Sequence, residues 1–297
     1  MRISVIVPYK DRASYLPRTL SSIAAQTLRP SELVLVDNGS TDNSRQVCDD
    51  FAESGDAQFP VRFLSHPAGG ASAARNAGAA FSTGDWLYFF DSDDEMSPDF
   101  LRDVTDLVNA SPELDIVAAP TRMIFTNGSE KIRRTYHNAS VADQILMGML
   151  STQGIVVRRA FFERGGGWNE ALPKWNDWEL GVRLLLSQPR IAWLSRAYHR
   201  IYQHPDSLTG TSVPATYALL RPAVDAVAAL PLDEPARRAL AARKIILAAE
   251  LQRAGMRDEA ASLLQGISPL GWREKFLAAY CHWVKRGGGL FYRTLLS

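Results

Sequence analysis

The sequence has few cysteines, no long apolar run and no large excess of charge. Only two cysteines, Cys48 and Cys281, occur among 297 residues, and their separation fits neither a disulfide framework nor a metal-binding or redox motif. A reducing, cytoplasmic setting is therefore expected. No apolar stretch is long enough to span a bilayer, and the apolar run near Met1 is too short for a secretory signal.

The charge balance argues against a nucleic-acid partner. The formal net charge is +1, and the usual nucleic-acid-binding motifs are missing. The charge is unevenly placed, because residues 211–297 contain 12 Lys and Arg against 7 Asp and Glu. This asymmetry predicts that the basic C-terminal part meets something acidic.

Short apolar runs alternate with helix-like segments in the first half of the chain. The runs are mostly continuous, as in strands buried on both faces; they lie at 3–7, 33–36, 61–64, 86–90, 116–119 and 155–157. Helical spacing occurs at 16–27, 44–53 and 71–81, and Ser97-Pro98 predicts a further helix start. This alternation predicts an α/β domain with a mainly parallel sheet covered by helices.

The second half is less regular and ends in helices. A helix at 177–186 and a strand at 191–194 are expected, followed by helices at 215–230, 234–254 and 257–265. The hairpin at 247–265 resembles one tetratricopeptide unit, but a single unit has no neighbour to bury its faces. We therefore expect two domains, 1–210 and a helical appendage at 211–297.

An acidic motif, FFDSDD, follows one of the apolar runs. In parallel sheets the ligand crevice lies beyond the carboxyl ends of the strands, and residues two apart in an extended segment, such as Asp91 and Asp93, face the same side. Clustered carboxylates need a cation or hydrogen bonds to compensate them, and oxygen ligands favour Mg²⁺ or Mn²⁺. The alternative is an acidic turn that caps the following helix.

Two further motifs are expected at the same edge of the sheet. Asp37 and Asn38 end a buried strand and offer polar groups that suit a nucleoside. Gly69-Gly70 precede a helix of small residues that carries Arg75, whose guanidinium can clamp phosphate oxygens. The alternatives are an ordinary strand-to-turn sequence and a helix packed closely on the sheet.

The segments VIVPYKDR, AAQT, VLVDNGSTD, GGASAARNAG and GDWLYFFDSDD, in this order, closely resemble family 2 of the glycosyltransferases. The resemblance covers about residues 2–210. It implies a GT-A fold, which is Rossmann-like, a nucleotide-sugar donor, inversion at the anomeric carbon, and Mn²⁺ or Mg²⁺. By resemblance, Asp93 contacts the metal, and Asp91 contacts the donor ribose or the metal shell. The other donor contacts that it implies are Pro8, Tyr9, Asp37, Asn38, Arg75 and Ser92.

A later segment, GGWNEALPKWNDWELGVRLLL, resembles the part of the family that carries the catalytic base, and it places Asp177 at that position. An acceptor hydroxyl loses its proton as it attacks, so a carboxylate must lie within reach, and a helix N-terminus favours its ionised form. The alternative is a structural aspartate at the start of a helix. Trp175 is a candidate for the acceptor site, or else a core residue. His204 matches a family position near the metal and diphosphate, or else is a solvated loop histidine.

Three positions depart from the usual pattern. Lys10 and Asn38 differ where the family contacts the nucleobase, and Asn176 replaces an acidic residue that often precedes the base. The choice of nucleobase is therefore open, with a UDP-sugar as the first expectation.

The predicted function is transfer of a sugar from a nucleoside diphosphate to a hydroxyl of a glycan or lipid-linked acceptor, in polysaccharide or glycan biosynthesis. One alternative is a non-catalytic nucleotide-sugar-binding or scaffold protein, given the three departures. Another is a sugar-phosphate nucleotidyltransferase, although its glycine-rich N-terminal phosphate loop is missing.

Aromatic and basic residues alternate at 272–296. This composition suits an anionic membrane surface and predicts peripheral contact with the inner face of the membrane. A subunit interface or packing within the chain is the alternative. The residues concerned are Trp272, Arg273, Lys275, Phe276, Tyr280, Trp283, Lys285, Arg286, Phe291, Tyr292 and Arg293.

Overall fold

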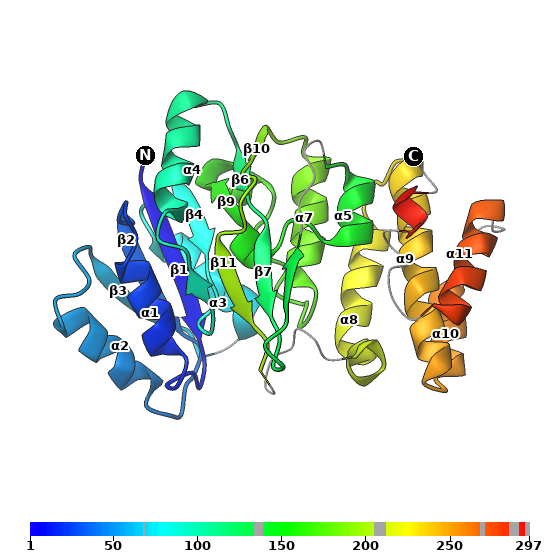
Figure 1. The fold of residues 1–297 in the computed structure, drawn as a ribbon, viewed down its shortest axis with the longest axis horizontal. Helices are drawn as coiled ribbons and strands as arrows, with labels where there is room; N and C mark the ends of the chain where they lie inside the picture. The colour runs from blue at the N-terminus through cyan, green and yellow to red at the C-terminus, as the bar shows by residue number, and fades with distance from the viewer. Residues whose placement is uncertain (68, 134–138, 205–211, 268–270, 285–290, 295–297) are drawn as a thin grey trace.

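The computed structural model describes residues 1–67, 69–133, 139–204, 212–267, 271–284 and 291–294. The domain boundary expected at 210/211 lies outside these residues, as do Lys285 and Arg286. Figure 1 shows a central sheet with helices on both faces and a group of C-terminal helices at one end. The α/β fold with a helical C-terminal region is confirmed.

The main sheet has seven strands in the order β10-β6-β9-β4-β1-β2-β3. Neighbouring strands are parallel except at β9, which runs antiparallel to both β4 and β6. The expected mainly parallel sheet is therefore confirmed. Its strands are β1 (Ile3–Tyr9), β2 (Glu32–Asp37), β3 (Val61–Ser65), β4 (Trp86–Phe89), β6 (Ile116–Ala118), β9 (Ile155–Arg158) and β10 (Ile191–Trp193).

Alternate residues of the central strands enter two different cores, which explains why the apolar runs are continuous. Val5 and Val7 of β1 belong to one core, and Ile6 belongs to the other. The first core is completed by α1 (Leu16–Ala24), α2 (Ser44–Glu53) and α4 (Phe100–Ala110). The second is completed by α3 (Gly70–Phe81), α6 (Arg159–Arg164) and α7 (Asn176–Leu186).

Helix α3 lies unusually close to the sheet. A Cβ at Gly78 would lie 2.6 Å from Ile6 Cγ2 and 2.9 Å from Val36 Cγ2, so only glycine allows this approach. The close packing brings the start of α3, which carries Arg75, to the carboxyl end of β1 and β4. The alternative of a helix packed closely on the sheet is therefore confirmed, and the same packing positions Arg75 at the cleft.

A second sheet of four short strands was not expected from the sequence. It has the order β5-β11-β7-β8, with β5 (Glu95–Met96), β11 (His199–Tyr202), β7 (Thr121–Ile124) and β8 (Glu130–Arg133). Strand β5 follows the acidic motif directly, and β11 pairs with it, His199 opposite Met96. This pairing brings the segment that carries His204 to the acidic motif. The strands are short and partly polar, so they lack the continuous apolar pattern that marks the main sheet.

The C-terminal helices pack on the main domain and share its core. Leu146 and Trp178 of α5 and α7 lie in one apolar cluster with Leu220, Leu247 and Leu263 of the later helices. Figure 1 shows α8 and α9 beside α5 and α7. An appendage packed on the main domain, rather than a free repeat unit, is what the structure shows. The helices are α5 (Val141–Met147), α8 (Val213–Ala228), α9 (Glu234–Arg253), α10 (Arg257–Leu264) and α11 (Trp272–Trp283).

Several smaller expectations can be compared with the structure. The helix expected to start at Ser97 begins at Phe100, with Asp99 as its N-cap, because Ser97 and Pro98 form the turn before it. Both cysteines are buried and unpaired, as expected. No helix within the described part of the chain combines the length and hydrophobicity needed to cross a membrane.

Candidate functional site

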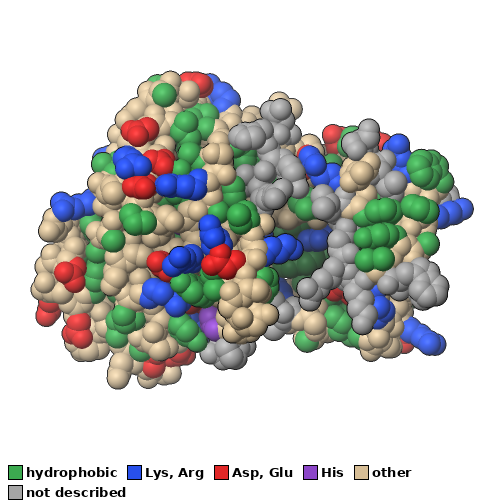
Figure 2. All heavy atoms as spheres, viewed as in Figure 1, with side chains coloured by type: hydrophobic (Ala, Val, Ile, Leu, Met, Phe, Trp, Pro, Cys, Tyr) green, Lys and Arg blue, Asp and Glu red, His purple; other side chains and the backbone are tan. Residues whose placement is uncertain are grey.

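A cleft of about 530 Å³ opens at the carboxyl ends of β1, β2 and β4 and extends to α7 and α8. Figure 2 shows a hollow between the sheet half and the helical half of the molecule, with Lys and Arg side chains at its edge. The cleft is the expected ligand crevice of a parallel sheet. Of the sequence-predicted residues it is lined by Pro8, Tyr9, Asn38, Arg75, Asp91, Ser92, Asp93, Trp175 and Asp177.

The acidic motif forms a turn rather than the end of a strand. Strand β4 ends at Phe89, so the argument from strand alternation for Asp91 and Asp93 was wrong. The turn nevertheless brings the two carboxylates close together. As a consequence, the charge of Asp91 raises the pKa of Asp93. The alternative, that the FFDSDD motif caps the following helix, is also excluded, because the N-cap of α4 is Asp99, which lies outside the motif.

Burial and mutual repulsion leave negative charge in this turn without full compensation. The pKa of Asp93 is raised by burial and by Asp91, against the opposing effects of His204 and Arg12. The pKa of Asp94 is raised well above its ordinary value by burial and by the other two carboxylates. Such a cluster is suited to a cation.

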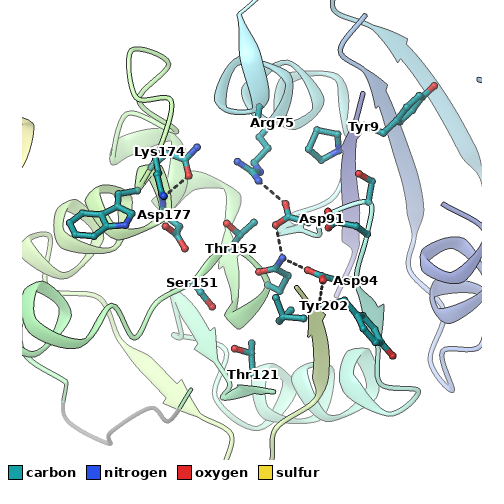
Figure 3. Close-up of a pocket in the computed structure, with 18 of the residues that line it drawn as sticks. Tyr9, Arg75, Asp91, Asp94, Thr121, Ser151, Thr152, Lys174, Asp177 and Tyr202 are labelled. Atoms are coloured by element: carbon teal, nitrogen blue, oxygen red, sulfur yellow. Dashed lines mark hydrogen bonds and ion pairs between the residues drawn. The ribbon is translucent and has the colours of Figure 1, made fainter. Parts of the chain in front are cut away.

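Gln153, which no sequence motif indicated, links two of these carboxylates. Its Nε2 donates to Asp91 Oδ2 and to Asp94 Oδ2, both at 2.5 Å. Gln153 lies in a short 3₁₀ helix, η1 (Thr152–Gly154), and Asp94 Oδ1 also accepts the backbone N–H of Tyr202 at 2.9 Å. Asp94 therefore ties the turn to η1 and to β11, as Figure 3 shows.

Arg75 is already bound to the acidic turn. Its Nη2 donates to Asp91 Oδ1 at 2.6 Å, and its guanidinium carbon lies 4.6 Å from the centre of the Trp168 ring. The Nε and Nη1 atoms are buried without a hydrogen-bond partner in the described structure. Because an unpaired buried donor is costly, these atoms are available to an oxyanion in the cleft.

His204 lies against Asp93 and is not a solvated loop residue. Its Nε2 is 2.9 Å from Asp93 Oδ2, its side chain is 9% exposed, and its ring stacks on Tyr15 at 4.5 Å. Nδ1 is buried and has no partner among the described residues. Carboxylate oxygens suit both Mn²⁺ and Mg²⁺, and the imidazole makes this pair a better match for Mn²⁺ than for Mg²⁺.

The protein alone does not supply a complete set of metal ligands. Over the described ranges, no three His, Cys, Asp or Glu side chains are grouped so that they could hold a metal ion. Phosphate oxygens commonly complete Mg²⁺ and Mn²⁺ sites in nucleotide-binding enzymes. Asp93 and His204 would therefore hold the cation together with the diphosphate of a bound nucleotide.

Asp177 lies at the first turn of α7, on the opposite side of the cleft. Its Oδ1 accepts the backbone N–H of Trp178 at 2.8 Å. Figure 3 shows Asp177 facing the space that Asp91 and Arg75 also face. Asn176, the departure from the usual acidic residue, donates to Ser72 Oγ at 3.0 Å and accepts from the Asp177 N–H at 2.8 Å. The amide thus ties α7 to α3 and fixes the backbone at Asp177.

The three tryptophans of this region have different roles. Trp168 and Trp178 are buried in the core, at 2% and 4% exposure. Trp175 lines the cleft, and its backbone is in the left-handed region at φ 59°. Of the three, only Trp175 is therefore placed where a ligand in the cleft could touch it.

Of the two residues expected to contact the nucleobase, Asp37 is engaged in a local hydrogen bond and Asn38 faces the cleft. Asp37 is not among the residues that line the cleft, and its Oδ1 accepts the backbone N–H of Ser40 at 2.8 Å. Asn38 does line it, with a buried Oδ1 that has no partner in the described structure. Asn38 therefore has an acceptor available for a ligand, whereas Asp37 shapes the turn.

Other residues of the cleft were not predicted from the sequence. They share a position on the second sheet, on η1 or before α7, which bring polar groups from distant parts of the chain to one place. These residues are Thr121, Ser151, Thr152, Gln153, Lys174 and Tyr202.

Comparison with known proteins agrees with this geometry. The sequence model described as "Glycosyl transferase family 2" matches residues 4–166. An uncharacterised glycosyltransferase of Nostoc sp. is 30% identical over 227 residues, which cover 71% of this chain and 69% of that protein. A PGL/p-HBAD biosynthesis glycosyltransferase of Mycobacterium tuberculosis is 30% identical over 213 residues, covering 70% of this chain and 78% of that one.

Solved structures share the fold. TarS of S. aureus in complex with UDP-GlcNAc superposes with a TM-score of 0.62 at 19% identity, covering 89% of this chain and 91% of that one. The mannosyltransferase PcManGT of Pyrobaculum calidifontis, in complex with GDP-Man and Mn²⁺, superposes with a TM-score of 0.61 at 18% identity. That match covers 99% of this chain and 79% of that one.

Proposed function

The chain belongs to glycosyltransferase family 2, and from this premise we propose that it is a metal-dependent inverting enzyme that transfers a sugar from a nucleoside diphosphate to an acceptor hydroxyl. The acceptor is a glycan or lipid-linked saccharide of polysaccharide or glycan biosynthesis. UDP is the first nucleotide to test, because TarS was solved with UDP-GlcNAc. GDP is the second, because PcManGT was solved with GDP-Man.

One observation carries the proposal: a single cleft has an acidic, histidine-containing side and, facing it, a separate carboxylate. The first side holds Asp91, Asp93 and the contact to His204. The second holds Asp177. A non-catalytic binding protein would need only the first side, so the separate carboxylate favours an enzyme.

The residues of the first side hold the donor. When bound, the divalent cation neutralises the charge that develops on the departing diphosphate. Asp93 and His204 hold this cation, and the two unpaired nitrogens of Arg75 donate to phosphate oxygens. Asn38, Tyr9 and Pro8 line the end that receives the nucleoside.

The residue of the second side acts on the acceptor. In a direct displacement the acceptor oxygen attacks the anomeric carbon from the face opposite the leaving diphosphate, and the configuration inverts. Asp177 accepts the proton of that hydroxyl as the bond forms. Residues 1–210 then supply the donor side and the base, and residues 211–297 supply part of the acceptor side through α8.

A peripheral membrane contact through α11 belongs to the same proposal. Trp272 and Phe276 are one helical turn apart and are 68% and 56% exposed, with Arg273 and Lys275 between them. An apolar pair flanked by cations suits an anionic bilayer surface. Other aromatic residues of the segment pack internally: Tyr292 is buried, and Phe291 stacks on Tyr280 at 3.9 Å. The side chain of Trp283 lies outside the described structure.

A panel of nucleotide-sugars, scored by thermal shift with and without Mn²⁺, tests the proposed function. A ligand that binds only the folded state stabilises it by mass action, so a cognate nucleotide raises the melting temperature when Mn²⁺ is present. Nucleotide release in the presence of candidate acceptors then identifies the reaction. No shift with any nucleotide in any metal condition would contradict the proposal.

A further inference from the structure

The half of the cleft beyond Asp177 has a different character from the donor half. It is lined by residues 173–177 before and at the start of α7, by β7 and β8 of the small sheet, and by Val213 and Leu220 of α8. Arg133, the last residue of β8, lies in this wall. Within the part of the chain that the structure describes, no ion pair or hydrogen bond engages its guanidinium.

Helix α9 places a second arginine behind the same wall. The guanidinium carbon of Arg243 lies 4.8 Å from the centre of the Trp175 ring, and Trp175 lines the cleft. Its Nη1 has one long hydrogen bond, 3.4 Å to the Leu146 carbonyl, and its Nε is buried without a partner among the described groups. No carboxylate of the described chain lies within 4.0 Å of it, unlike Arg237 and Arg238 of the same helix.

The two arginines are close enough to repel each other. Burial lowers the pKa of Arg243 to about 10. The charge of Glu250 opposes this effect, and the charge of Arg133 adds to it. The side chain is still charged at neutral pH, and Glu250, the carboxylate that acts on it, lies beyond ion-pair distance. Partly buried cations that repel one another are costly, and a bound anion would offset that cost.

Backbone strain occurs at the residue that joins this wall to the base. Trp175 has φ 59° and ψ 26°, a left-handed conformation that is unfavourable for a non-glycine residue. Trp175 is the N-cap of α7, two residues before Asp177, and its ring lies against Arg243. Strain kept at such a point is typical of a functional site.

From this arrangement, and on the basis of the proposed glycosyl transfer, we propose that the acceptor is a phosphate-bearing saccharide whose phosphate is bound by Arg133 beside Trp175, with the charge of Arg243 behind the Trp175 ring adding to the attraction. Guanidinium forks match the oxygens of phosphate, and an aromatic face suits the apolar face of a sugar ring. The donor diphosphate has its own partners, Arg75 and the metal-binding pair, on the other side of the cleft.

The test uses the full-length protein saturated with UDP and Mn²⁺, so that the donor side is filled. Glucose 1-phosphate and methyl glucoside are titrated separately, with tryptophan fluorescence as the readout. The variants are Arg243→Met and Arg133→Met. Arg237→Met removes the same charge from an exposed position of α9 and is the matched control. UDP affinity and the melting temperature are measured for every variant.

We expect glucose 1-phosphate to bind and methyl glucoside to bind at least 10-fold more weakly. Loss of the charge-assisted contact in Arg133→Met should weaken binding of the phosphate about 10- to 100-fold, and Arg243→Met, which removes a charge behind the wall, should weaken it less. UDP affinity and the Arg237→Met control should match the unmodified protein. Because Arg133 lies at the cleft surface, its variant keeps the test valid if Arg243→Met folds poorly.

Equal binding of the two sugars, no binding of either, or unchanged phosphate binding in Arg133→Met would overturn the inference. If UDP itself fails to bind in Mn²⁺, the proposed function fails instead, so the two failures are distinguishable. Dodecyl phosphate in micelles and a glycerol phosphate oligomer are compared with uncharged counterparts, to show whether a lipid or a polymer presents the phosphate. Preference for either charged form supports the site, and preference for neither contradicts it.

Discussion

The side-chain amide of Gln153 donates to Asp91 and Asp94 at once, with both distances at 2.5 Å. One neutral group therefore holds two carboxylates that would otherwise repel each other. Asp91 in turn binds Arg75, so the amide orients the group that faces the donor side of the cleft. Gln153 is a positioning residue, since it acts through the carboxylates.

Gln153→Leu keeps most of the side-chain volume and removes both hydrogen bonds. Bonds to charged groups contribute about 1.5–3 kcal/mol, so we expect a lower melting temperature and turnover reduced about 10- to 100-fold. The Mn²⁺ concentration needed for UDP binding should also rise, which a purely structural role would not cause. Gln46→Leu, which breaks an exposed Gln46–Asp50 bond in α2, is the control. Unchanged metal dependence would show that Gln153 does not position the metal side.

Asp93→Asn should weaken UDP binding in Mn²⁺ while leaving the weaker, metal-free binding unchanged. An amide keeps the shape of the carboxylate, but it cannot balance the charge of the cation. His204 would still offer its imidazole, so some metal-dependent binding should remain. Calorimetric titration of UDP with and without Mn²⁺ measures this, with the exposed Asp50→Asn as the control. Equal affinities for both proteins in both conditions would remove Asp93 from the metal site.

The exposed pair on α11 gives a prediction about membranes. The intact protein should float with phosphatidylglycerol vesicles, and Trp272→Ser with Phe276→Ser should abolish flotation, because both side chains lose their apolar surface. Leu28→Ser, which changes another exposed apolar residue far along the chain, should float normally. Failure of the intact protein to float would leave packing against another subunit as the explanation of this pair.

Glu32 gives a prediction about stability and pH. Burial alone would raise its pKa, but hydrogen bonds from Ser4, Thr83 and Arg62 outweigh burial and lower the pKa to about 2. A carboxylate whose pKa is lower in the folded state stabilises above its unfolded pKa, here 4.5, and loses that effect as the pH falls toward 2. The contribution at neutral pH is about 3 kcal/mol.

Glu32→Gln should therefore lower the free energy of unfolding at pH 7, and the difference should shrink between pH 4.5 and 2. Urea denaturation at pH 7, 4 and 3 measures it. Glu53→Gln, at the exposed end of α2, should behave like the unmodified protein. A difference that stays constant over this pH range would mean that the ionised form of Glu32 is not responsible.

The main sheet and its helices could be predicted because a strand that is buried on both faces requires a continuous run of apolar residues. Strands β1, β2 and β3 and helix α2 lie within a few residues of the expected ranges. The small sheet could not be predicted, because strands such as β5 (Glu95–Met96) are too short and polar to show a period. That sheet carries Arg133 and Tyr202, so these two residues of the cleft were not predicted.

The motif residues of the cleft could be located in advance only through the family pattern. Asp91, Asp93 and Asp177 do line one cleft, although the strand argument for the first two was wrong. Gln153 gave no signal, because its role depends on η1 meeting a turn 59 residues away in the chain. Glu179, a natural second choice for the base, is 2% exposed and paired with Arg183, so it cannot take that role.

In the proposed reaction, Asp177 accepts the proton of the acceptor hydroxyl while other residues hold the donor. Turnover and donor affinity of Asp177→Asn, measured side by side once a donor and an acceptor are identified, test it most directly. Asparagine keeps the shape and can still hydrogen-bond, but it cannot accept the proton, and general-base assistance is worth about 10²–10⁴ in rate. We predict a loss of turnover of that size with donor affinity nearly unchanged, and normal behaviour of the control Asp99→Asn. Near-normal turnover in Asp177→Asn would show that Asp177 is not the general base.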